Sequence, residues 1–111
     1  MPEPIIDRTV FAELQATAGD EFVTELVDTF LEEAPQMLAE LRSAQTTGAA
    51  ERFRRAAHSL KSNSNTFGAL ALGELARRLE LGGLVPDAAP LAALEAEYAR
   101  AAAALRELCH G

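Results

Sequence analysis

Apolar residues recur at helical spacing along most of this 111-residue chain, and no other feature constrains its fold as strongly. The longest pattern covers about residues 20–44, where apolar residues lie three or four positions apart, as on one face of an α-helix. Pro35 lies inside this pattern and removes a backbone hydrogen-bond donor. Because the apolar face resumes after Pro35, we expect one bent helix rather than two separate ones.

Residues that favour helix ends divide the chain into further helical segments. Asp7 and Asp20 are suitable N-caps, Gly19 is a natural stop, and Pro90 suits a first turn. The expected helices run from the Asp7 cap to about 16, from about 20 to 44, from 49 to 67, from about 70 to 81, and from 90 onward. We therefore expect an all-α fold, an up-down-up-down four-helix bundle with a short additional N-terminal helix, as a single domain over residues 1–111.

Composition limits where the chain works and what it binds. Hydrophobic residues make up 49% of the chain, which is enough for a core. No apolar run approaches the ~20 residues of a membrane span, and the first residues lack the pattern of a secretory signal. We expect a soluble cytoplasmic protein, or a soluble piece of a larger one, without membrane contact.

The few potential metal ligands do not suggest a metal site. Cys109 is the only cysteine, and of the two histidines only the terminal His110 follows a glutamate at Glu-x-x-His spacing, Glu107. Bundle-core di-metal sites use two such pairs on facing helices. We expect Cys109 to occupy an apolar helix position. His110, beside Gly111, is expected to be a frayed tail.

The charge distribution separates one basic segment from an acidic remainder. The net charge is −7, yet residues 52–78 hold six of the ten Lys and Arg residues and a single acid. An acidic molecule repels nucleic acid and anionic membranes, so we expect neither as a partner. The basic segment has two interpretations: ordinary surface arginines, or residues that steer an acidic partner site toward it.

A histidine occupies the middle of this basic segment. At about 100° per residue, one helix face outside the apolar stripe carries four polar residues: Arg54, His58, Lys61 and Asn65. His58 is therefore expected to be solvent-accessible, with a cation one turn away on either side. A neutral imidazole is a competent nucleophile near pH 7. An isolated surface histidine, however, usually has no function, so the residues around His58 decide whether a function is expected for it.

Small polar residues follow His58 in the run SNSNT at residues 62–66. Such residues are poor helix formers because their side chains compete for backbone hydrogen bonds. Either the helix ends near Lys61 and the run is a connector, or the helix continues to Phe67 and the run forms a surface that another protein approaches closely. The residue pattern alone favours neither.

The residues around His58 match a known motif. They include His58, Leu60, Lys61, Ser64, Gly68, Leu75, Leu79 and Glu80. In this respect the chain resembles the histidine-containing phosphotransfer (HPt) domain family, with its motif H-x-L-K-G-S-S, a Gly about ten residues after the His, and a helix ending in L-E. Two positions depart from the motif, because Ser62 replaces the usual Gly and Asn63 the usual Ser. The Ser62 hydroxymethyl group narrows the approach to His58 without closing it.

This resemblance implies a function in phosphorelay signalling. His58 would accept a phosphoryl group from the aspartyl phosphate of a receiver domain and pass it to another receiver's aspartate. Lys61 would neutralise phosphate charge, and four residues would lie next to the phosphate or the partner: Arg54, Ser62, Asn65 and Gly68. The receiver would supply Mg²⁺, so the chain would need no cofactor of its own.

The resemblance also implies which proteins the chain binds, and it leaves other functions open. The expected partners are response-regulator receiver domains and a sensor histidine kinase, which can be a hybrid kinase. The chain itself is expected to be a monomeric carrier, not an enzyme with turnover of its own. The departures at Ser62 and Asn63 keep open an HPt-like bundle that binds a receiver or kinase without phosphotransfer. The dimerisation region of a histidine kinase fits less well, because Ser59 rather than an acid follows His58 and the chain has no ATP-binding motifs.

Overall fold

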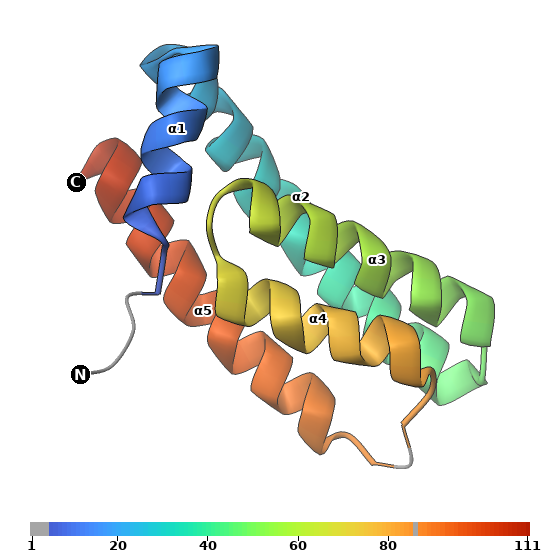
Figure 1. Cartoon of the computed structure of the whole chain (residues 1–111). Helices are drawn as coiled ribbons and strands as arrows, with labels where there is room; N and C mark the ends of the chain where they lie inside the picture. Colours follow the sequence, from blue (N-terminus) through green and yellow to red (C-terminus); the bar gives the residue numbers. More distant parts are fainter. Residues whose placement is uncertain (1–4, 86) are drawn as a thin grey trace.

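A computed structural model describes residues 5–85 and 87–111, and this part of the chain folds into five helices (Figure 1). They are α1 (Arg8–Ala18), α2 (Asp20–Thr47), α3 (Ala50–Thr66), α4 (Leu70–Gly82) and α5 (Ala89–His110). None of them is long and apolar enough to cross a membrane.

Helices α2 to α5 surround a common core. Helix α3 packs between α2 and α4, and α5 closes the bundle by packing on both α2 and α4, whereas α1 crosses one end of α2 and also contacts α3 (Figure 1). The all-α bundle with an additional N-terminal helix is therefore confirmed. The long α2 runs through Pro35 without a break, as the continuous apolar face predicts.

The core fixes the rotation of each helix about its own axis. Side chains from all four bundle helices are fully buried, the largest being Phe53, Leu41, Leu60, Leu72, Leu94, Leu105, Val23 and Val27. Because Phe53 and Leu60 anchor one side of α3, the residues on the opposite side of that helix face solvent.

The first helix boundary agrees with the sequence, and the second differs from it. The Asp7 carboxylate accepts hydrogen bonds from the Thr9 and Val10 amides at 3.0 and 3.2 Å, as an N-cap should. Asp20, in contrast, lies in the first turn of α2 and does not cap it. Gly19 takes that position with φ +91°, and its carbonyl accepts a hydrogen bond from the Val23 amide.

The small polar run continues α3 as far as Thr66, so its interpretation as a connector is wrong. Three side chains of the run bond to the carbonyl four residues back: Asn63 to Ser59 at 2.9 Å, Ser64 to Leu60 at 2.6 Å, and Thr66 to Ser62 at 2.9 Å. Their polar groups are thus satisfied within the helix, which removes the main reason for the chain to leave it.

The end of α5 also differs from expectation. His110 is the last residue of that helix, and its Nε2 lies 2.8 Å from Oδ1 of Asp28 on α2. The expectation of a frayed tail is wrong because this contact between helices could not be seen from the local sequence.

Gly68 forms the turn between α3 and α4. Its φ of +82° is in the left-handed region, and the Asp7 amide donates a 2.8 Å hydrogen bond to its carbonyl. A Cβ at this position would lie 2.7 Å from the Asp7 carbonyl oxygen. Only glycine therefore lets the start of α1 approach the turn so closely.

Replacing Gly68 with alanine should destabilise the bundle by about 2 kcal/mol or more, through left-handed strain and the clash with Asp7. Urea unfolding followed by circular dichroism measures this change. Gly82→Ala is the matched control: a Cβ there meets nothing within 4 Å, and the residue is helical, so stability should stay equal or rise slightly. Equal stability of the two variants would contradict the proposed strain at Gly68.

Candidate functional site

His58 lies at the centre of α3 on its exposed face. Its side chain is 55% exposed, whereas the adjacent Ala57 and nearby Leu60 are fully buried. The expectation that His58 is solvent-accessible is therefore confirmed. The apolar stripe of α3 provides the reason, because it turns the polar face outward.

Glu80 on α4 makes the closest contact to the imidazole. Its Oε2 lies 2.6 Å from Nδ1 of His58. The Glu80 side chain is only 12% exposed, so its carboxylate lies in the seam between α3 and α4. In the sequence Glu80 stands out only as part of the motif, and nothing local in the chain indicates that it touches a histidine 22 positions earlier.

Lys61 meets the other oxygen of the same carboxylate. Its Nζ forms an ion pair with Oε1 of Glu80 at 2.8 Å, and its side chain is 25% exposed. Since His58 and Lys61 lie one turn apart, a single carboxylate from the neighbouring helix holds both of them. We call these three residues the His58 cluster.

The charge of Glu80 determines which imidazole nitrogen is free. Lys61, and after it His58, lower the pKa of Glu80 below its ordinary value of 4.5, so the carboxylate is ionised at neutral pH. An ionised carboxylate only accepts hydrogen bonds. In the neutral imidazole Nδ1 must therefore carry the proton and donate it to Glu80, which leaves the lone pair on Nε2.

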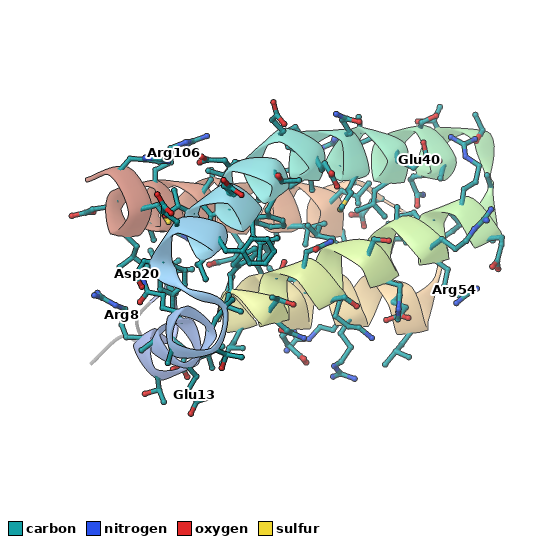
Figure 2. The ribbon with its side chains drawn as sticks, turned by 90° about the horizontal axis from the view of Figure 1, so that it is seen from above. Arg8, Glu13, Asp20, Glu40, Arg54 and Arg106 are labelled. Atoms are coloured by element: carbon teal, nitrogen blue, oxygen red, sulfur yellow. The ribbon has the colours of Figure 1, made fainter. Side chains whose placement is uncertain are left out.

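Arg54 lies one turn before His58 but points to a different partner. Its guanidinium bonds to both carboxylate oxygens of Glu51, with Nε 3.2 Å from Oε2. Figure 2 labels Arg54 near the start of α3. The hydrogen bond that Arg54 donates to Glu51 and, more weakly, the charge of Glu80 raise the pKa of Arg54. Arg54 is thus within electrostatic range of the His58 cluster without touching it.

The other cations of the basic segment are mostly neutralised. Arg52 pairs with Glu40 at 2.6 Å, and Arg77 and Arg78 both pair with Glu74. The hydrogen bond from Arg77 lowers the pKa of Glu74 to about 2, so this acid stays charged. The electropositive patch expected from residue counts is therefore largely balanced by acids on the same or neighbouring helices.

The remaining predicted site residues lie at different distances from His58. Ser62 is exposed one turn after it, and Asn65 is exposed two turns after it. The Asn65 side chain lies so close to Gly73 of α4 that a Cβ on Gly73 would overlap it. Gly68 is buried in the turn beyond the end of α3, about 15 Å along the helix axis from His58. The structure gives Gly68 a packing role, and its contact with a partner stays a prediction.

The pKa of Glu80 should rise toward 4.5 when Lys61 is replaced by methionine, and less when His58 is replaced by glutamine, because Lys61 is the larger cause of the shift. Carbon-13 NMR of the carboxyl group during an acid titration measures both changes. Because the folded-state pKa is lowered, the stabilisation by Glu80 is complete above pH 4.5 and is lost as the pH falls through the folded value. Arg106→Met is the control, and an unchanged pKa in Lys61→Met would contradict the ion pair.

Comparisons with known proteins agree with this geometry. The family model described as the Hpt domain matches residues 25–110. Among solved structures, the chain is similar to histidine-containing phosphotransfer protein B (HptB) from Pseudomonas aeruginosa PAO1, with 29% sequence identity and a TM-score of 0.88 over 97% of this chain and 96% of that one. A comparison with curated proteins gave no match. On the evidence of its fold, its motif and the matched residues, this chain belongs to the Hpt domain family.

Proposed function

We propose that His58 accepts a phosphoryl group from the aspartyl phosphate of one receiver domain and passes it to the aspartate of another. Membership of the Hpt family supports histidine phosphotransfer in a phosphorelay. The observation that carries the assignment to His58 is its exposed imidazole with Nδ1 held by Glu80. His110, the other histidine, is bound through its Nε2 to Asp28, far along the chain.

The geometry indicates how the transfer would proceed. The lone pair on Nε2 of His58 attacks the phosphorus, an N–P bond forms, and the bond between phosphorus and the aspartate oxygen breaks. The aspartate leaves as a carboxylate, while the proton on Nδ1 stays hydrogen-bonded to Glu80. The reverse sequence delivers the group to the second receiver. Such a transfer depends mainly on in-line positioning and on neutralisation of the moving charge.

Glu80 acts in this proposal as a positioning residue. It fixes the ring orientation and keeps the proton on Nδ1, so that Nε2 faces the partner with a free lone pair. After transfer, the same hydrogen bond stabilises the proton that remains on the phosphorylated ring. A carboxylate in this place therefore favours both the nucleophile and the product.

Lys61 supplies the charge compensation. Its ammonium group lies one turn from His58 and already balances Glu80, and a phosphoryl group on Nε2 would offer it a second anion. Arg54, Ser62 and Asn65 lie on the same face and are proposed to assist through charge or hydrogen bonds, while Mg²⁺ is proposed to come from the receiver. The chain would then act as a monomeric carrier without turnover, supplied by a sensor kinase and its receivers.

The competing proposal is a bundle that binds a receiver without accepting its phosphoryl group. One observation favours it: Ser62, exposed one turn after His58, adds a side chain where the family motif usually has none. The intact His58 cluster argues for transfer, because binding alone requires no ring held in one tautomer.

His58→Gln should abolish phosphorylation by a panel of labelled phospho-receiver domains, whereas the wild-type chain should take up label from at least one. Gel autoradiography after timed mixing measures the transfer. His110→Gln is the matched control and should be labelled like wild type. Label on the His58→Gln variant would refute the assignment, and tight binding of a receiver without label on wild type would favour the binding-only bundle.

Lys61→Ala should slow transfer by about tenfold, which is less than the loss of about a hundredfold or more for a fully enclosed donor, because Lys61 is partly hydrated. Rapid-quench measurement with a saturating phospho-receiver gives this rate. Arg78→Ala removes the same charge from an exposed and loosely paired position on α4, and its rate should stay within about twofold of wild type. Equal rates for the Lys61→Ala variant and wild type would remove the proposed role of this residue.

A further inference from the structure

Glu80 occupies the last turn of α4, which ends at Gly82. Leu79, just before Glu80, is 5% exposed and anchors the backbone in the core, whereas Leu81 after it is 70% exposed. The Gly83 amide closes the helix with a 3.0 Å hydrogen bond to the Leu79 carbonyl. Last turns of helices fray easily, because their final carbonyls lack partners within the helix. The carboxylate that orients the reactive imidazole therefore lies in the turn of α4 that is most prone to fraying.

Two half-buried residues fix the chain again just beyond this turn. Leu84 and Val85 pack against the core, and Gln45 near the end of α2 binds the Val85 backbone twice. The Val85 amide donates a 3.0 Å hydrogen bond to Oε1 of Gln45, and Nε2 of Gln45 donates to the Val85 carbonyl. We call these two hydrogen bonds the Gln45 clasp. Figure 1 shows that α2 and α4 both finish at this end of the bundle.

The clasp satisfies the backbone of Val85 on its own. Among residues 5–85 and 87–111, no other hydrogen bond reaches the Val85 backbone. A glutamine side chain suits this task because its amide offers both an acceptor oxygen and a donor nitrogen. The chain from Leu79 to Val85 is thus held at both of its ends, with Glu80 between them. Opening the clasp releases one end, which favours frayed conformations of the last turn.

We propose that Gln45 is a positioning residue for the reaction at His58. It acts through the chain after α4, whose last turn carries Glu80. While the clasp is closed, Glu80 stays in the seam and Nδ1 of the imidazole keeps its proton. When the clasp opens, Glu80 leaves the ring for part of the time and both imidazole tautomers become populated. In one of them Nε2 carries the proton and has no lone pair for phosphorus. This inference rests on the proposed function, because it takes Nε2 to be the reacting nitrogen.

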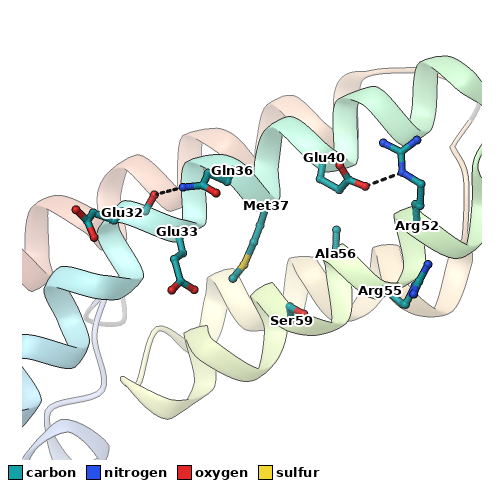
Figure 3. Close-up of a pocket in the computed structure, with 9 residues that line it drawn as sticks. All are labelled: Glu32, Glu33, Gln36, Met37, Glu40, Arg52, Arg55, Ala56 and Ser59. Carbon is teal, nitrogen blue, oxygen red and sulfur yellow. Dashed lines mark hydrogen bonds and ion pairs between the residues drawn. The ribbon is translucent and has the colours of Figure 1, made fainter.

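The clasp lies apart from the surface on the other side of His58. A groove of about 930 Å³ runs there between α2 and α3 (Figure 3). Its lining residues lie between Glu32 and Glu40 on α2 and between Arg52 and Ser59 on α3. Gln45 is outside it, so a change at Gln45 leaves these residues in place. Its expected effect on His58 passes through the end of α4.

The test compares Gln45→Met with Arg42→Met. Methionine has about the length of glutamine but forms neither hydrogen bond of the clasp. Arg42 joins α2 to Glu95 of α5 at the same end of the bundle, with Nε 2.7 Å from Oε2, and it does not bind the chain after α4. The control therefore loosens this end of the bundle without opening the clasp. Thermal unfolding followed by circular dichroism records the global stability of both variants.

Nitrogen-15 NMR of the imidazole reports the tautomer of His58, and hydrogen exchange reports the last turn of α4. At about pH 8.5, where an ordinary imidazole is neutral, wild type should hold mainly the Nδ1–H tautomer. Gln45→Met should raise the Nε2–H fraction and speed exchange of the Gly83 amide by about tenfold. Transfer from a saturating phospho-receiver should slow by about threefold. Arg42→Met should change each quantity by less than about twofold, because its ion pair is exposed.

A second substitution tests the route through the last turn. Gly82→Ala reduces fraying, because alanine is a better helix former than glycine and a Cβ there meets nothing within 4 Å. Added to Gln45→Met, it should restore about half of the lost Nδ1–H tautomer. Gln45→Glu keeps the acceptor for the Val85 amide and loses the donor, so its tautomer ratio should lie between those of wild type and Gln45→Met. It also replaces Gln45→Met in every comparison if the methionine variant does not fold.

Three results would overturn the proposal. They are a wild-type tautomer ratio in the Gln45 variants, an equal tautomer change in Arg42→Met, and no recovery when Gly82→Ala is added. None of these measurements requires phosphoryl transfer. A failure of the proposed function would appear separately, as missing label on His58 of the wild-type chain.

Discussion

The candidate site depends on the interactions that the Glu80 carboxylate makes with two residues of α3. It lies in the seam between α3 and α4 and holds His58 through one oxygen and Lys61 through the other. A largely buried carboxylate is acceptable there because the imidazole of His58 hydrogen-bonds to one oxygen and the Lys61 ammonium group forms an ion pair with the other. Neither donor could be placed correctly without the packing of α3 on α4, which is the most extensive helix pair of the bundle.

Close packing between these helices continues beyond the cluster. Gly73 of α4 lies against the side chain of Asn65, and a larger residue at position 73 would push that side chain away. On α3 itself, the side chains of Asn63, Ser64 and Thr66 turn back onto their own helix. The surface that follows His58 is therefore formed by small polar side chains, although Ser62 replaces the glycine of the motif.

The sequence was sufficient for features that depend on local periodicity. Helical spacing predicted that His58 lies outside the apolar stripe of α3, and the buried Phe53, Ala57 and Leu60 do lie on the other side of that helix. Asp7 as a helix cap and the continuity of α2 through Pro35 followed from equally local rules. These predictions are confirmed because each depends on residues within a few turns of one another.

Features that depend on the alignment of two helices could not be predicted in this way. The contact of Glu80 with His58 requires the register of α3 against α4, and the contact of His110 with Asp28 requires that of α5 against α2. The approach of Asp7 to Gly68 likewise joins distant parts of the chain. Arg54 is a different case, since Glu51 stands three residues before it in the same helix. That spacing alone indicates a local ion pair. The sequence could therefore have shown that Arg54 is not a free cation beside His58.

The two sides of α3 carry separate sets of charged residues. On the α4 side, Glu80 holds the His58 ring through one oxygen and pairs with the Lys61 ammonium group through the other. On the α2 side, Glu32, Glu33 and Arg55 are exposed, and within the described residues they form no ion pair with Glu80 or Lys61. Because the two sets of residues do not share contacts, their free-energy contributions should be close to additive. Substitutions of Glu32, Glu33 or Arg55 on the α2 side are therefore expected to leave the contacts of Glu80 with His58 and Lys61 in place.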